Sequence, residues 1–101
     1  MINRNSNPMG WSLLLSDLAD AHEHLGELIR ELQVDPEYGE PEFRIDLGHV
    51  YAHLNRAWHR RNVPEDFTEA EWGPAGQFPK DLEPVAVLAP IANLRVLACR
   101  L

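Results

Sequence analysis

Apolar residues recur at spacings of three and four over residues 11–33, with charged residues between them. Such spacing lines one face of an α-helix, because 3.6 residues complete each turn. Residues 41–62 repeat the pattern, so the sequence predicts two amphipathic helices. The apolar positions are Leu14, Leu18, Ala21, Leu25, Leu28, Ile29 and Leu32 in the first, and Phe43, Leu47, Val50, Leu54, Ala57 and Trp58 in the second.

The link between the two segments, VDPEYGEP, carries two prolines and a glycine. These residues break a helix, and Pro41 suits the first position of the next one, where a missing N–H costs nothing. A connection this short favours an antiparallel two-helix hairpin.

The periodic spacing of apolar residues is weaker in the rest of the chain. Residues 1–10 read as a polar tail, and residues 63–84 as an irregular segment, rich in proline and glycine, that wraps the helices. Residues 85–89 fit either a strand or a helical turn, because Pro90 disfavours helix at the residue before it. A short C-terminal helix or strand is expected to end the chain. Residues 1–101 therefore form one small, mainly α-helical domain.

The chain has 101 residues, and a hairpin of this size has little to bury against. We therefore expect a homodimer that completes a helical bundle. The charge balance is 9 basic against 16 acidic residues. A net charge of −7 disfavours nucleic acid and anionic membranes as partners and favours a basic protein. Cys99 is the single cysteine, which excludes an internal disulfide and suits the cytoplasm.

Three of the five histidines fall on one side of the predicted hairpin. His49 and His53 are one turn apart on the second helix. If residues that face each other have numbers summing to roughly 76, His24 of the first helix falls between them. The same register pairs Asp17 with Arg60 and Asp20 with Arg56.

Two interpretations of this side of the hairpin remain open. In one, the three histidines bind a divalent transition metal, with Asp20 or Asp46 either as a fourth ligand or as a group that supports the ligands from behind. In the other, this side is an exposed ladder of ion pairs worth about 0–1 kcal/mol each, and no cofactor is bound. The HxxxH spacing lacks the glutamate of a metalloprotease motif and does not by itself decide between them.

The opposite side of the hairpin carries small residues. Gly26 and Gly48 lie at nearly the same level, and each glycine costs a helix about 1 kcal/mol relative to alanine. Either another backbone packs closely there, from the C-terminal segment or a second hairpin, or the glycines are merely tolerated.

The sequence contains no recognisable catalytic or nucleotide-binding motif. Phe67, Trp72 and Phe78 lie in the acidic segment after the second helix, where they could anchor an interface or pack on their own helices. The first interpretation of function is thus a small acidic, non-catalytic protein that binds another protein, as adaptors, antitoxins and immunity proteins do. The alternative is a metal-binding helical bundle, including a metal-dependent hydrolase, that uses His24, His49 and His53.

Overall fold

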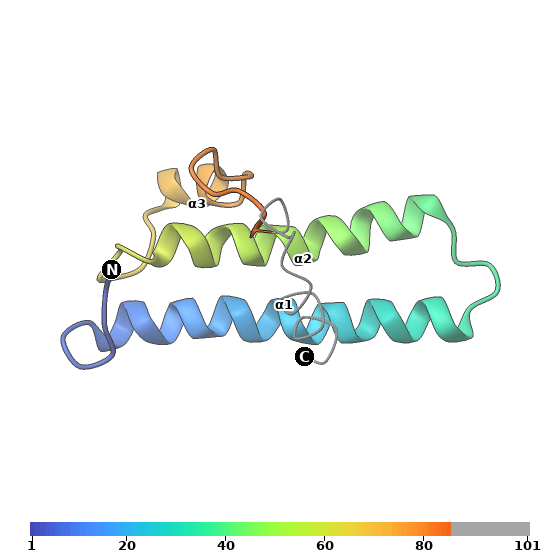
Figure 1. The fold of residues 1–101 in the computed structure, drawn as a ribbon, viewed down its shortest axis with the longest axis horizontal. Helices are drawn as coiled ribbons and strands as arrows, with labels where there is room; N and C mark the ends of the chain where they lie inside the picture. The colour runs from blue at the N-terminus through green and yellow to red at the C-terminus, as the bar shows by residue number, and fades with distance from the viewer. Residues whose placement is uncertain (86–101) are drawn as a thin grey trace.

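The computed structural model describes residues 1–85, in which three helices form the framework (Figure 1). α1 spans Pro8–Val34, α2 spans Glu40–Arg60 and α3 spans Glu69–Ala75. α1 and α2 lie side by side and run in opposite directions, and α3 contacts α2. The expectation of a mainly α-helical protein is confirmed for the described residues, which contain no strand.

The N-terminal residues are more ordered than the sequence suggested. α1 begins at Pro8, three residues before the apolar pattern starts, because the fixed φ of proline suits the first helical position. Ile2 is buried, and its N–H donates to the carbonyl oxygen of Arg61 at 2.7 Å. The prediction of a polar tail over residues 1–10 is therefore wrong: this stretch starts α1 and fastens the chain end to the end of α2.

The connector and the start of α2 are held by local polar contacts. The Asp35 carboxylate accepts the N–H of Glu37 at 2.9 Å, and the Glu42 carboxylate accepts the N–H of Gly39 at the same distance. The Tyr38 hydroxyl donates to Asp46 at 2.7 Å. The Glu42 bond satisfies the N–H of Gly39, the residue that caps α2, and the other two bonds close the connector.

The core between α1 and α2 is narrow. It contains Leu14, Ala21 and Leu28 of α1, with Val50 and Ala57 of α2. The α1 positions repeat every seven residues, so a residue four positions after one of them lies about 40° further around the helix, and a residue one position after lies about 100° further. Four members of the predicted stripe occupy such positions and are 41–52% exposed: Leu18, Leu25 and Leu32, four positions later, and Ile29, one position later. His22, one position after Ala21, is exposed as well.

The segment predicted as irregular over residues 63–84 contains α3. The N–H of Thr68 donates to the Glu71 carboxylate at 2.9 Å, a reciprocal cap that starts this short helix. After α3, the Asn55 amide donates to the carbonyl oxygen of Gly76 at 2.9 Å, and the Trp58 indole donates to Asp81 at 3.0 Å. Side chains of α2 thus hold the segment against the hairpin.

The expected C-terminal helix or strand and Cys99 lie beyond residue 85, outside the described residues. Within residues 1–85, no helix combines the length and the apolar character needed to cross a bilayer.

Candidate metal centre

Three histidine rings meet on one side of the pair formed by α1 and α2. The ring centroid of His24, on α1, lies 4.1 Å from that of His49 and 5.4 Å from that of His53. The two α2 rings are 4.9 Å apart, as expected for residues four positions apart on a helix. The antiparallel packing of the helices brings the third ring to this pair.

The nitrogen atoms of the three rings are close enough to share one ion. One nitrogen from each residue can be chosen so that all three lie within 4.8 Å of one another. Two histidine ligands of a tetrahedral zinc ion would be roughly 3.4 Å apart, given Zn–N bonds of about 2.0–2.1 Å. Small side-chain rotations would close the difference.

Asp17 lies directly behind this histidine cluster. It is a buried residue of α1, 5% exposed, and its carboxylate oxygen lies 3.0 Å from Nδ1 of His53. Its other oxygen accepts a hydrogen bond from Nε of Arg60. Nε of Arg56 forms an ion pair of 3.6 Å with the oxygen that faces His53. Both arginines are buried as well, so the group is not a solvated ladder of surface charges.

A second group of potential ligands is formed by Asp17, Asp20 and His53. Asp20 contributes an oxygen 4.0 Å from Nδ1 of His53. The negative charge of Asp17 is already balanced by two guanidinium groups, which would repel a cation placed beside them. The cluster of His24, His49 and His53 is therefore the better cation site of the two.

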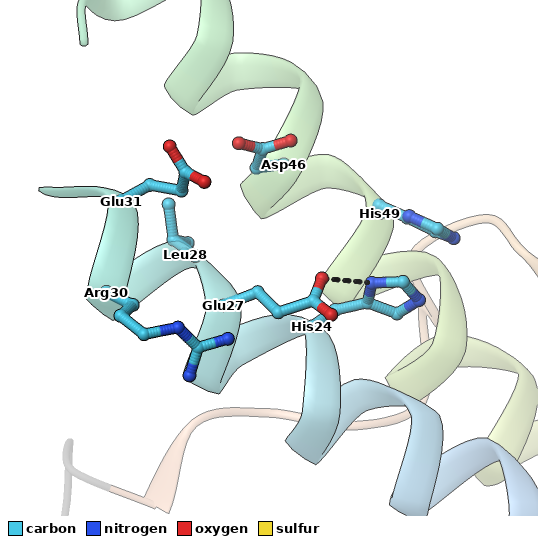
Figure 2. Close-up of a pocket in the computed structure, with 7 residues that line it drawn as sticks. All are labelled: His24, Glu27, Leu28, Arg30, Glu31, Asp46 and His49. Atoms are coloured by element: carbon cyan, nitrogen blue, oxygen red, sulfur yellow. Dashed lines mark ion pairs between the residues drawn. The ribbon is translucent and has the colours of Figure 1, made fainter. Parts of the chain in front are cut away.

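A hollow of about 380 Å³ opens beside the cluster (Figure 2). His24 and His49 form part of its wall, together with Glu27, Leu28, Arg30, Glu31 and Asp46. Figure 2 shows the Glu27 side chain reaching back to His24 along α1, and a Glu27 carboxylate oxygen lies 3.7 Å from Nδ1 of His24, an ion pair when that ring is protonated. The His24 nitrogen that faces away from Glu27 is left for a metal.

The surroundings of His49 favour the neutral form of its ring. Burial lowers the pKa of His49, and the neighbouring His24, His53 and Arg56 lower it further, while Asp46 opposes them. A histidine binds metal only in its neutral form. A lowered pKa means that His49 stays neutral, and available to a metal, at more acidic pH.

Neither of the other proposed ligands belongs to the group formed by the three histidines. Asp20 does not belong to the histidine cluster but lies on the Nδ1 side of His53, near Asp17. Asp46 accepts the Tyr38 hydroxyl. The expected pairing of Asp17 with Arg60 is present, whereas the ion pair of Arg56 is formed with Asp17 and not with Asp20.

The aromatic residues singled out as interface anchors contact α2. Phe67 lies under the Arg60 guanidinium, 4.1 Å from its ring centroid, and Trp72 under that of Arg56 at 4.4 Å. Phe78 packs edge-on against Tyr51, with ring centroids 5.1 Å apart. Trp72 and Phe78 nevertheless remain 50% and 66% exposed.

The two helical glycines of the opposite side are open. A methyl group built on Gly26 or on Gly48 would meet nothing within 4 Å among the described residues. No described element therefore packs on these positions, and an interface there stays a prediction.

The sequence did not reveal the buried state of Asp17, Arg56 and Arg60. Helical periodicity placed these residues on a flank, and a flank of a bare hairpin is exposed. Their burial depends on the segment after α2, whose aromatic rings cover the guanidinium groups. The sequence did offer one signal for this burial: the two arginines near the end of the second helix are followed, within about a dozen residues of that end, by Phe67 and Trp72, and arginine often packs on aromatic rings.

No family model matches this chain, and the searches of curated proteins and of solved structures give no significant match either.

Proposed function

We propose that the protein binds a divalent transition metal through His24, His49 and His53. The observation that supports this proposal is the convergence of three imidazole rings from two helices, with centroids no more than 5.4 Å apart. Imidazole ligands suit zinc, copper, iron and nickel. Ligands carried by packed helices are held more rigidly than ligands on loops.

A merely structural cluster explains this arrangement less well. Three imidazoles contribute little apolar packing, and their protonation would place like charges a few ångströms apart. The carboxylates of Asp17 and Glu27 approach Nδ1 of His53 and of His24. Metal-ligating histidines commonly present one nitrogen to a carboxylate in this way.

The experiment is a metal analysis of protein purified without an affinity tag. We expect close to one equivalent of zinc, iron, nickel, copper or manganese per chain, lost in His53→Ala and in His49→Ala. His22→Ala is the matched control, because His22 is an exposed residue of α1 outside the cluster. Metal-free protein that does not take up any of these ions at micromolar concentration would contradict the proposal.

Hydrolysis is a finer form of this proposal. Among the described residues, no fourth side chain joins the three histidines, and three protein ligands with an open position are typical of catalytic zinc sites. The hollow beside His24 and His49 gives such a position access to a small substrate. Zinc-dependent cleavage of an activated ester, lost in His49→Ala, would support hydrolysis. A zinc-loaded protein without this activity would contradict hydrolysis but not metal binding.

A second candidate function is protein binding, and the exposed apolar face of the hairpin favours it. Leu15, Leu18, Leu25, Ile29 and Leu32 form an apolar seam on α1, with spacings of three, seven, four and three. This is the spacing of coiled-coil contact positions, with His22 at the missing one. Phe43 and Leu54 of α2 are also about 40% exposed.

A second copy of the chain is the simplest partner for this seam, since like seams can pack against each other in a two-fold dimer. Light scattering tests this proposal: we expect a dimer that Leu25→Glu converts to a monomer. Glu23→Gln is the control and should have no effect, because Glu23 is exposed and lies beside the seam. A wild-type monomer would exclude the homodimer, and with it the expected helical bundle.

A further inference from the structure

We propose that Asp17 is the positioning residue of the metal centre, because it fixes the tautomer and the ring orientation of His53. This inference rests on the proposed metal binding by the three histidines. Asp17 would not bind the metal itself, but it would determine whether His53 can bind it.

The hydrogen bond at Nδ1 of His53 determines which ring nitrogen is free. Two groups lie near this atom: an Asp17 oxygen at 3.0 Å and Nη2 of Arg56 at 3.4 Å. A carboxylate only accepts and a guanidinium only donates, so Nδ1 can be bonded to one of them but not to both. Both partners are charged, and the contact to Asp17 is the shorter of the two. Nδ1 therefore carries the proton, and Nε2 keeps its lone pair for a metal.

Asp17 is held so that this bond has one geometry. Its side chain is 7% exposed, and its second oxygen is occupied by Nε of Arg60. Arg60 in turn donates to Asp66 at 3.1 Å and lies over the Phe67 ring. Nε of Arg56 lies 3.6 Å from the Asp17 oxygen that faces His53, and its guanidinium lies over Trp72. A carboxylate held by two guanidinium groups can orient an imidazole without reorganising when metal arrives.

The substitution Asp17→Asn gives the proposal a sharp test. Arg60 only donates hydrogen bonds, so the amide oxygen would turn to Arg60 and the amide NH₂ group to His53. Nδ1 would then have to accept, the ring proton would move to Nε2, and the nitrogen needed by the metal would be blocked. The same substitution in serine proteases produces the wrong histidine tautomer.

The first measurement needs no metal and no variant. Nitrogen chemical shifts of the metal-free protein at mildly alkaline pH report the tautomer of each histidine. We expect His53 in the Nδ1–H form. A His53 ring found in the Nε2–H form would overturn the proposal, whether or not the protein binds metal.

The second measurement compares zinc affinity in D17N and D20N. Asp20 is the matched control, because it also faces Nδ1 of His53 but at 4.0 Å and with its side chain 47% exposed. We expect D17N to lose about 10–100-fold in affinity and to shift His53 towards Nε2–H, with D20N within about twofold of wild type.

The outcomes separate this inference from the proposed function. Equal affinities in D17N and wild type would overturn the role of Asp17 while leaving metal binding in place. A wild-type chain that takes up no metal would overturn the proposed function. If D17N does not fold, the tautomer of the unaltered chain still decides, since it is measured without any substitution.

Discussion

His49 is the residue whose chemistry depends most on its neighbours. It has two imidazole rings within 5 Å and the Arg56 guanidinium close by, and only Asp46 opposes their effect. The balance is set by burial first and by like charge second, and both disfavour the protonated ring. Protonation of His49 is therefore costly in the metal-free protein.

We expect the pKa of His49 in the metal-free protein to lie below the ordinary histidine value of about 6.5. Because the folded pKa is depressed, the unfolded chain binds more protons, so the free energy of unfolding decreases as the pH falls through about 6.5. NMR titration of the ring protons measures the pKa, and denaturant unfolding at several pH values measures the stability. His24→Ala should raise the His49 midpoint; an unchanged midpoint would contradict the role of its neighbour.

At the scale of elements, Gly10 of α1 and Gly48 of α2 differ in what surrounds them. Gly10 donates its N–H to the carbonyl oxygen of Pro64 at 3.0 Å, so the start of α1 approaches the backbone that follows α2. A methyl group at Gly10 would collide with the carbonyl oxygens of Val63 and Pro64, whereas one at Gly48 would meet open space. Gly10 is needed for a close approach and Gly48 is not.

Gly10→Ala should accordingly destabilise the protein by about 1–3 kcal/mol, the usual cost of forcing atoms into a packed contact. Gly48→Ala is the matched substitution and should stabilise it by about 0.5–1 kcal/mol, because alanine loses less entropy in a helix. Denaturant unfolding of both variants gives these values. A destabilising Gly48→Ala would indicate that another backbone lies on that side, one of the two interpretations that the sequence left open.

The connector offers a separate test through Tyr38. Desolvation of its hydroxyl, followed by the hydrogen bond to Asp46, raises its pKa to about 12, with nearby carboxylates adding to the effect. The folded pKa lies above the ordinary value of about 10, so this contribution to stability is present below pH 10 and decreases as the pH rises towards 12.

In a Tyr51→Phe background Tyr38 is the single tyrosine. Its ionisation, followed by ultraviolet absorbance, should have a midpoint near 12 that falls when Asp46→Asn removes the charged acceptor. A midpoint near the ordinary value in the Tyr51→Phe protein would mean that the connector is not closed by this bond in solution.

At the scale of the whole molecule, the sequence predicted the helices better than it predicted their surroundings. Periodicity located both long helices to within three residues at each end, because spacing is a local property. The register arithmetic also placed His24 beside His49 and His53. Burial could not be predicted in the same way: Arg56 and Arg60 are covered by a segment without periodicity, and Leu25 is exposed although it fits an apolar stripe.

The apolar seam and the histidine cluster flank the contact between α1 and α2 on opposite sides, as the helical positions of Leu25 and His24 require. Two chains joined along their seams would therefore carry their histidines on outward surfaces, each set complete within a single chain. Metal uptake should then follow a simple one-site curve whose midpoint is the same in dilute and concentrated solution, whatever the state of association.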